Sequence, residues 1–446
     1  MDFASVKINT PMTAMTTISI PVPMSVAEGA VRADGPSKRI ISAVAIGNGL
    51  ITYDFTVYSF SAVIIGKLFF PSGSALVSLL LSLATFGAGF IMRPLGALFI
   101  GHLADRRGRK AGLTLSITLM TLGTGIIAFS PSYASIGWAA ALLMVLARLM
   151  QGFAAGGEIG VSTAALMELA DKGRRCYLTS WRGTGQGVAA LAGALIGACT
   201  TAALTPEAMQ LWGWRIPFIL GMLIGPVGWY LRRQMTERPM DAAYRPSLKR
   251  MFAHHPRALW FGILSMAGSS ASAYIMVFYM PTYLVTVLHL PPIFSLLSAC
   301  LASTVIFTGT PLIGYIADRQ ARRKPIQYLL LVGCILLVYP AFLALTHGVG
   351  EIASLLIIMG YTALALTNTG PSSVMMLEAF PRHHRATGIS IIYGFGVATF
   401  GGFSPFIVTW LIGATGNPMA PAWYLLVALC ISLFALIRFP DTVQED

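Results

Sequence analysis

A single carboxylate, Asp54, lies in the middle of an otherwise uncharged apolar run from residue 41 to residue 66. Placing an ionised side chain at the centre of a membrane costs at least ~2.5 kcal/mol, so we expect Asp54 to face a polar cavity or a cationic partner. Burial favours the neutral acid and a nearby arginine favours the carboxylate, so a group balanced between them can load and release a proton. Asp54 is therefore a candidate proton-coupling residue, and the alternative is a permanent ion pair. Glu158, in another apolar run, is a candidate for proton relay or for helix packing.

Two arginines in apolar runs, Arg148 and Arg182, are candidates for binding an anion. A guanidinium group can hold a carboxylate with two parallel hydrogen bonds. Arg148 is followed at four-residue spacing by Gly152 and Gly156, so on a helix all three share a face along which another helix can approach closely. Arg148 could bind a substrate or pair permanently with Asp54. Arg182 could bind a substrate or extend to the lipid headgroups.

Uncharged polar side chains in the apolar runs supply further candidate contacts for a substrate. They are Asn48, Tyr58, Gln186, Asn368 and Tyr393. The second half of the chain has no charged residue in the interior of its apolar runs, so a contact from that half must come from an uncharged group: Tyr274, Tyr279, Tyr283, Asn368, Tyr393 or a nearby hydroxyl. Each such residue is weak evidence by itself, because buried Tyr and Asn side chains commonly serve packing alone. Arg93, which is followed by Pro94, is interpreted as structural.

The elements that carry these residues are apolar helices. Of 446 residues, 56% are hydrophobic and 11% are charged, and the mean hydropathy is +0.73; an average soluble domain has about 25% charged residues. Runs of about 20 apolar residues are long enough to cross a bilayer as helices. They predict twelve spans, at 41–66, 75–101, 112–130, 135–166, 178–204, 213–231, 258–288, 293–316, 326–346, 350–379, 387–413 and 421–438.

The polar segments between the spans predict how the chain is organised. The five cysteines have no metal-ligand spacing, and one long basic segment separates the sixth span from the seventh. We expect a disordered cytoplasmic tail at 1–39, a six-helix bundle at 40–231, a cytoplasmic linker at 232–257, a second six-helix bundle at 258–438 and a cytoplasmic C-terminal tail at 439–446.

The net charge of +13 is distributed in a way that predicts the orientation in the membrane. Of the 30 Lys and Arg residues, 25 fall in the N-terminal tail, the linker, every second loop and the C-terminal end of the last span (Arg438), whereas the opposite loops hold only Lys67 and Arg215. Because basic residues are retained on the cytoplasmic side, both termini should be cytoplasmic. The basic surplus is thus a topology signal, and no nucleic-acid partner is expected.

Two motifs recur in the two predicted halves. The sequences GHLADRRGRK at 101–110 and GYIADRQARRK at 314–324 share the pattern G-x-x-A-D-R followed by basic residues. In MELADKGRR and LEAFPRHHR a glutamate precedes an arginine by seven residues. The two pairs are offset by 213 and 210 residues. Nearly equal offsets indicate duplicated halves, an architecture in which the substrate site lies between the halves near the middle of the membrane.

The first of these motifs carries a family resemblance. The pattern G-x-x-x-D-R-x-G-R-[RK] is complete at 101–110 and resembles the signature of the major facilitator superfamily. Further stretches resemble the metabolite:proton symporter branch, and within it the citrate and tricarballylate symporters; they are FIMRPLG at 90–96, RLMQGFAAGGE at 148–158, TSW at 179–181, WGWRIPF at 212–218, MPTY at 280–283 and GGFSP at 401–405. The resemblance covers about residues 41–438 and implies an all-α membrane protein of twelve transmembrane helices in two pseudo-symmetric bundles.

The resemblance also implies roles for the repeated charged residues. We expect them to form a conformational switch at the cytoplasmic ends of the helices, with solvated surface charge as the alternative; they are Asp105, Arg106, Arg109, Glu168, Arg175, Asp318, Arg322, Glu378 and Arg385. One position departs from the family, because Ile51 stands where relatives often carry a glutamate. The proton must then be handled by Asp54 and Glu158, or coupled differently.

We therefore expect a proton-coupled importer of a small tri- or dicarboxylate such as citrate, tricarballylate, aconitate or itaconate. Alternatives are 2-oxoglutarate, shikimate or a zwitterionic osmolyte such as proline or betaine, and, more distantly, a transport-inactive sensor. The chain has no H-E-x-x-H pattern and no Walker loop, so neither an enzyme nor an ATP-driven pump is expected. We expect no cofactor, the proton gradient as energy source, and a monomer in the bacterial inner membrane whose partners are the organic anion, protons and lipid.

Overall fold

The structure is a computed structural model that describes residues 38–107, 109–233, 253–320, 322–381 and 385–440. All regular secondary structure in these residues is helical, which confirms the predicted all-α class. Most of the predicted N-terminal tail, linker and C-terminal tail lies outside the described residues. Within them, eleven helices are long and apolar enough to cross a membrane. The sixth predicted span coincides with an 18-residue helix that is not among the eleven and ends in Arg232 and Arg233.

The N-terminal half supplies six long helical segments joined by short turns. Its helices are α1 (Lys38–Phe69), α2 (Ala75–Ile91), α3 (Arg93–Arg107), α4 (Arg109–Phe129), α5 (Tyr133–Ile136), α6 (Trp138–Glu168), α7 (Arg175–Ala203), α8 (Pro206–Leu211) and α9 (Ile216–Arg233), with 3₁₀ turns η1 (Lys172–Arg174) and η2 (Gly213–Arg215).

The C-terminal half is built in the same way, with π-helical turns inside two of its long segments. Its elements are α11 (Pro256–Ala273), η3 (Tyr274–Tyr279), α12 (Met280–Thr286), α13 (Pro292–Asp318), α14 (Lys324–Thr346), α15 (Glu351–Leu366), α16 (Thr369–Glu378), α17 (Arg385–Val397), η5 (Ala398–Gly402), α18 (Ser404–Thr415) and α19 (Ala420–Arg438); η3 and η5 are the π turns.

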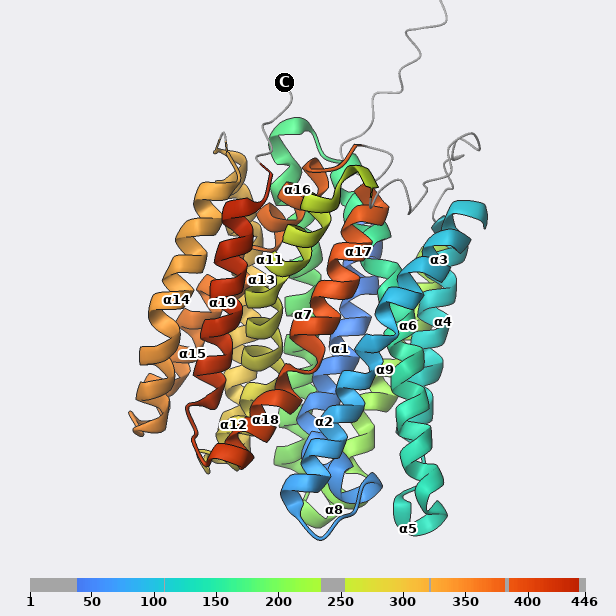
Figure 1. Cartoon of the computed structure of the whole chain (residues 1–446). Coiled ribbons are helices and arrows are strands. Elements are labelled where there is room, and N and C mark those ends of the chain that lie inside the picture. Colours follow the sequence, from blue (N-terminus) through green and yellow to red (C-terminus); the bar gives the residue numbers. More distant parts are fainter. Residues whose placement is uncertain (1–37, 108, 234–252, 321, 382–384, 441–446) are drawn as a thin grey trace, which may run out of the picture. The chain divides into compact units, whose positions relative to one another are not determined.

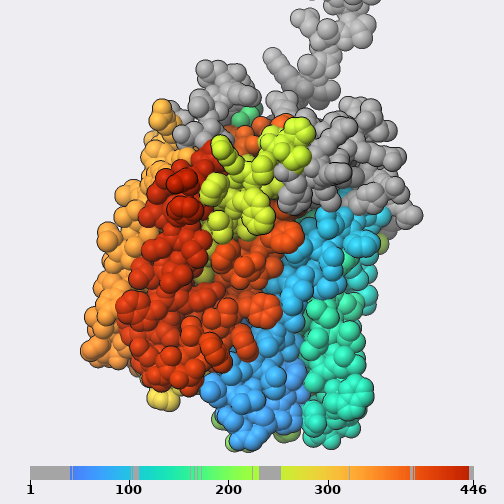
Figure 2. Space-filling model, viewed as in Figure 1, coloured from blue at the N-terminus to red at the C-terminus, as the bar shows by residue number. Residues whose placement is uncertain are grey.

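The two halves pack side by side. In Figure 1, α3, α4 and α6 lie on the right and α14, α15 and α19 on the left, with α1, α7, α11 and α13 between them. The halves meet where α7 packs on α13, α17 on α3 and α6, and α18 on α2. Figure 2 shows part of this boundary on one face, where red and orange side chains of the C-terminal half pack directly against blue side chains of the N-terminal half.

Glycines set the spacing between α6 and the helix pair α2 and α3. A Cβ atom built on Gly152 would lie 1.6 Å from the carbonyl oxygen of Gly89, and one on Gly156 would lie 2.0 Å from the carbonyl oxygen of Arg93. No larger residue fits either position without moving backbone. The close helix approach predicted for the glycines after Arg148 is therefore present.

Four of the predicted spans are present at the expected places but are interrupted helices, a feature that the apolar runs do not indicate. A proline follows each interruption within a few residues, and proline removes one backbone hydrogen bond and clashes with the carbonyl four residues earlier. The interruptions are at Met92 before Pro94, at η3 before Pro281, at Thr367 and Asn368 before Pro371, and at η5 before Pro405.

Candidate functional site

A cavity of about 210 Å³ lies between the two halves. Its walls come from α1, α3, α6 and α7 on one side and from η3 and most C-terminal helices on the other. The volume is below the roughly 300–1,000 Å³ of pockets for drug-sized ligands, so it suits a small metabolite. The polar residues at its wall include Asn48, Thr52, Arg93, Arg182, Gln186, Ser270, Tyr274, Asn368 and Tyr393.

Arg182 reaches this cavity from α7 and is only 2% exposed. Its Nη2 atom donates a hydrogen bond of 2.9 Å to the hydroxyl of Tyr393 on α17, and its guanidinium carbon lies 5.0 Å from the centre of that ring. The Tyr393 hydroxyl is also 3.1 Å from the Oγ atom of Ser373. Arg182 and Tyr393 come from opposite halves, so this hydrogen bond crosses the cavity.

Arg93 reaches the same cavity from the interruption between α2 and α3 and is 3% exposed. Its guanidinium carbon lies 4.1 Å from the ring centre of Phe90 and 5.1 Å from that of Phe55, with Tyr274 of the other half beside it. The sequence favoured a structural role for Arg93 and did not predict that this side chain lines the cavity. The signal that could have revealed it is the proline at 94, which breaks the helix at that point.

The cavity wall carries positive charge without a compensating carboxylate. No Asp or Glu is among the lining residues, and within the described residues neither Arg93 nor Arg182 forms an ion pair. The Nε atoms of both arginines are buried without a hydrogen-bond partner, as are the side-chain oxygens of Asn48 and Asn368. A buried cation without a counter-ion is costly, so this wall is suited to an anion that also accepts and donates hydrogen bonds.

Asp54 and Arg148 form a second polar cluster, which lies inside the N-terminal half. Nη1 of Arg148 lies 2.8 Å from Oδ2 of Asp54, and both side chains are 0% exposed. Thr124 donates a hydrogen bond of 2.7 Å to Oδ1 of Asp54, and Gln151 donates one of 2.9 Å to the same atom. The guanidinium of Arg148 stacks on Tyr58, 3.7 Å from the ring centre. Sequence reasoning did not identify Thr124 or Gln151, which carry no charge to distinguish them.

None of these five residues lines the cavity. Arg148 and Tyr58 were predicted to bind substrate, but in this conformation they hold Asp54 and are closed off from the space between the halves. The pairing of Arg148 with Asp54 matches the alternative weighed from the sequence. Glu158, the second proton candidate, is buried on α6, and its neighbour Ile159 lines the cavity. Asn48, Gln186, Asn368 and Tyr393 line the cavity, and their contact with a substrate stays a prediction.

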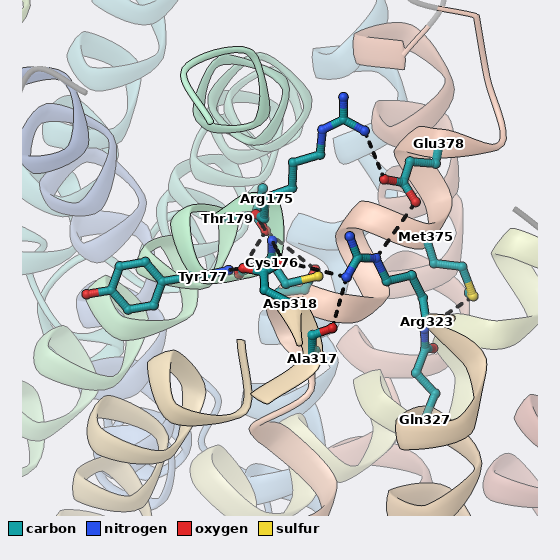
Figure 3. A network of polar contacts seen from close by, with 11 residues as sticks. Arg175, Cys176, Tyr177, Thr179, Ala317, Asp318, Arg323, Gln327, Met375 and Glu378 are labelled. Atoms are coloured by element: carbon teal, nitrogen blue, oxygen red, sulfur yellow. Dashed lines mark hydrogen bonds and ion pairs between the residues drawn. The ribbon is translucent and has the colours of Figure 1, made fainter. Parts of the chain in front are cut away.

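A charged network joins the halves at one end of the bundle, where α7 begins and α13 and α16 end (Figure 3). Nη1 of Arg175 lies 3.2 Å from Oε1 of Glu378. The two carboxylate oxygens of Asp318 accept hydrogen bonds of 2.9 and 2.8 Å from the backbone N–H groups of Cys176 and Tyr177. A carboxylate at the N-terminus of a helix is stabilised by the helix dipole and by otherwise unpaired amides. We call Arg175, Asp318, Arg323 and Glu378 the charged latch.

Three residues of the charged latch are among the predicted switch residues, and the fourth, Arg323, is not. Arg323, not the predicted Arg322, completes it: its Nη1 is 3.6 Å from Asp318 and its Nε is 4.0 Å from Glu378, whereas Arg322 is exposed. Arg385 donates to the carbonyls of Leu377 and Phe380 at the end of α16. The side chains of Asp105, Arg106, Arg109 and Glu168 lie outside the described residues.

The halves also touch on the other side of the cavity. Ser59 of α1 donates a hydrogen bond to the carbonyl of Phe278 in η3. The ring centres of Phe90 and Tyr274 are 5.0 Å apart, and those of Phe86 and Phe278 are 6.3 Å apart. Contacts between the halves thus lie at both ends of the cavity. Among the described residues, no group of three or more His, Cys, Asp or Glu side chains is arranged to hold a metal ion.

Comparisons with known proteins agree with this architecture. The chain is 36% identical over 400 residues to the citrate-proton symporter of Salmonella typhi, covering 89% of this chain and 92% of that protein. It is 29% identical over 440 residues to the proline/betaine transporter of Salmonella typhimurium, covering 95% and 87%. The xylose transporter XylE from E. coli, solved in a partially occluded inward open conformation, superposes with a TM-score of 0.74 at 17% identity, covering 91% and 98%.

At that low identity the likeness to XylE concerns the fold alone. The sequence profile of the Major Facilitator Superfamily, however, matches residues 44–398, most of the chain. Two helical halves around a central polar cavity, matched by this profile over both halves, make the chain a member of the Major Facilitator Superfamily.

Proposed function

We propose that this transporter imports a small di- or tricarboxylate together with a proton by alternating access. The observation that carries the proposal is the central cavity with two buried arginines, Arg93 and Arg182, and no carboxylate at its wall in the part of the chain that the structure describes. An organic anion supplies the missing negative charge. The identity to a citrate-proton symporter supports the same substrate class.

The uncharged wall residues would orient the anion. Gln186 lies one turn after Arg182 on α7, and Asn48 lies at the point where α1 crosses α7, next to Gly49, whose built Cβ lies 3.3 Å from the carbonyl oxygen of Gly185. Asn368 and Tyr393 face the cavity from the other half. Amide and hydroxyl groups both donate and accept hydrogen bonds, so they can bind the carboxylates and hydroxyls of such acids.

The Asp54 and Arg148 pair would carry the proton. When Asp54 accepts a proton, Arg148 loses its counter-ion, and a buried cation left in this way costs about 3–5 kcal/mol. That free energy is available to move α1 and α6 and expose the pair to one side of the membrane. A proton that enters with the anion offsets its charge, so that the membrane potential opposes uptake less. Glu158 is the second proposed proton-carrying residue.

A zwitterionic osmolyte is the alternative substrate. The rings of Phe55, Tyr274 and Phe278 line the cavity and could hold a quaternary ammonium group through cation–π contacts. The two arginines would repel the same group, because no carboxylate of the wall compensates them. The charge of the cavity therefore favours the organic acid.

We also propose that the latch end of the bundle faces the cytoplasm of a bacterial cell, with both termini on that side. The basic loops predicted to be cytoplasmic include those at the ends of α3, α13 and α16. A fluorescent protein fused to the C-terminus should fluoresce, and alkaline phosphatase fused at the same point should stay inactive. Active phosphatase would reverse the orientation.

Substrate counterflow in proteoliposomes tests the substrate class. Vesicles containing the full chain are preloaded with citrate, tricarballylate, aconitate, itaconate, 2-oxoglutarate, shikimate or betaine, and exchange is measured against labelled external substrate. We expect at least one di- or tricarboxylate to exchange faster than in protein-free vesicles, and an inward proton gradient to drive its accumulation. Exchange of betaine with none of the carboxylates would contradict the proposal.

A further inference from the structure

We infer that the cavity binds its substrate at two separate anionic groups, one at Arg182 and one at Arg93, each arginine being paired with a tyrosine of the opposite half. The inference rests on the proposed function and makes it more specific. It predicts that the transported acid carries at least two negative charges. It also assigns Arg93, Tyr274 and Ser270 to the substrate site.

The first subsite is built around Arg182. Its Nη2 atom is bonded to Tyr393, while its buried Nε atom has no partner. The start of α16 lies against the same turn of α7, because a Cβ atom on Gly183 would lie 3.2 Å from Oγ1 of Thr369. Asn368, whose side-chain oxygen also lacks a partner, immediately precedes Thr369 and lines the same cavity as Arg182. A carboxylate here would find a guanidinium, a phenol and an amide.

The second subsite is built around Arg93. Aromatic rings, at 4.1 and 5.1 Å, hold its guanidinium from the N-terminal half, and Tyr274 lies beside it from the other. Ser270 lies one turn before Tyr274, and its buried hydroxyl has no partner. Gly401 of η5 keeps this pair together, since a Cβ atom there would lie 2.6 Å from the Tyr274 ring and 3.3 Å from Cβ of Ser270. Arg93 and Ser270, two buried groups with unused hydrogen-bonding capacity, thus both lie beside Tyr274.

The two subsites belong to one cavity, and α17 lies against both of them. Gly394 of α17 lies against α3, where its built Cβ atom would be 3.7 Å from Cα of Pro94. Tyr393 and Arg93 are the residues immediately before these two contact points. Arg182 therefore meets Tyr393 next to the place where α17 crosses α3, and Arg93 extends from that same crossing. Both subsites can be spanned by a small molecule in a cavity of about 210 Å³.

A substrate with a single anionic group cannot neutralise both arginines of the cavity. A monoanion would neutralise one arginine and leave the other as a buried cation with no carboxylate, whereas a dianion neutralises both. Both arginines belong to the N-terminal half and both tyrosines to the C-terminal half. An acid that occupies both subsites therefore contacts both halves at two points, and its binding favours the state in which the halves enclose it.

The test compares tricarballylate with its terminal diamide, which has nearly the same shape but a single carboxylate. Binding is measured by the thermal shift of the detergent-solubilised full chain, with counterflow as second readout. In the wild type we expect the diamide to bind at least about tenfold more weakly, as for the loss of one charge-assisted contact. Arg93→Gln and Arg182→Gln should each weaken tricarballylate binding by a similar factor.

Two lysine variants distinguish a loss of binding from a loss of stability if a glutamine variant is unstable. Arg93→Lys and Arg182→Lys retain the charge, and should bind tricarballylate better than the glutamine variants at equal melting temperature without ligand. Arg438→Gln, which removes an exposed arginine at the end of α19, is the matched control and should bind as the wild type does.

The outcomes separate this inference from the proposed function. Equal binding of tricarballylate and its diamide, or unchanged tricarballylate binding after Arg93→Gln, would overturn two-point recognition and leave an organic-acid transporter with a single anion site. If neither tricarballylate nor any other carboxylate of the counterflow panel is bound, the proposed function fails and the inference fails with it.

Discussion

The buried charges of the N-terminal half fall into two kinds at the scale of single residues. Asp54 and Arg148 neutralise each other and take further hydrogen bonds from Thr124 and Gln151. Arg93 and Arg182 have no carboxylate partner among the described residues and face the cavity. The Asp54–Arg148 pair, which is shut off from the cavity, suits a site that takes up and releases a proton. The two arginines at the cavity wall, which have no counter-ion, suit a site that binds an anion. The structure therefore separates a proposed proton site from a proposed substrate site.

Asp54→Asn tests the proton site. We expect gradient-driven accumulation to fall to the equilibrium level, because the amide cannot take up and release a proton, while exchange of substrate continues. Proteoliposomes with and without an inward proton gradient measure both activities. Glu351→Gln, which alters an exposed acid at the start of α15, should leave accumulation unchanged. Accumulation that survives Asp54→Asn would remove this residue from proton coupling.

Sequence reasoning found the rare intramembrane charges but could not assign all of them. Asp54 and Arg148 stand out because charge is costly in lipid, and their pairing was one of two alternatives. Their exclusion from the cavity depends on how α1, α4 and α6 pack, which the sequence does not reveal. The position of Arg93 at the cavity could not be predicted for the same reason, since its direction is set by the break at Met92.

At the scale of the helices, the interruptions shape the cavity. Arg93, Tyr274 and Asn368 each lie at or next to an interruption, and each lines the cavity. Breaks free backbone groups and redirect side chains, and π turns occur frequently at functional sites. The apolar runs predicted the spans within several residues. They did not predict the breaks, because prolines are tolerated within continuous membrane helices as well.

Gly152→Ala tests the close contact between α6 and α2. The new methyl group would lie 1.6 Å from the Gly89 carbonyl oxygen, so the helices must separate, and we expect a loss of about 1–3 kcal/mol in the free energy of unfolding. Thermal unfolding of the purified protein in detergent measures the change. Gly360→Ala is the control, because a Cβ atom there meets nothing within 4 Å and alanine favours the helix. Equal melting temperatures for the two variants would refute the contact.

At the scale of the whole described bundle, the charged latch reports on the conformation. It joins α7 of one half to α13 and α16 of the other, so it can exist only when the halves are together at that end. The repeat in the sequence predicted that Glu378, Arg175 and Asp318 would act in switching. It could not show that Arg175 pairs across the halves, since equivalent motifs also allow pairing within each half.

Asp318→Asn combined with Glu378→Gln should open the latch end. Cys176 is fully buried beneath the latch, so we expect its labelling by a maleimide to become at least about fivefold faster, as for a coupling of roughly 1 kcal/mol. Peptide mass spectrometry distinguishes Cys176 from the exposed cysteines. Asp171→Asn, an exposed acid just before α7, is the control. An unchanged labelling rate at Cys176 would show that the latch does not hold the halves together.

Every charged side chain that reaches the cavity belongs to the N-terminal half, and the C-terminal half contributes only neutral groups to the wall. A substrate held by charge would then stay bound to the N-terminal half during transport. The C-terminal half would close over the substrate and fit its shape with neutral side chains. Relatives of such a protein could evolve to transport acids of different size or branching through substitutions in the C-terminal half alone. Proton coupling would be unchanged by such substitutions, because the residues proposed to carry the proton lie in the N-terminal half.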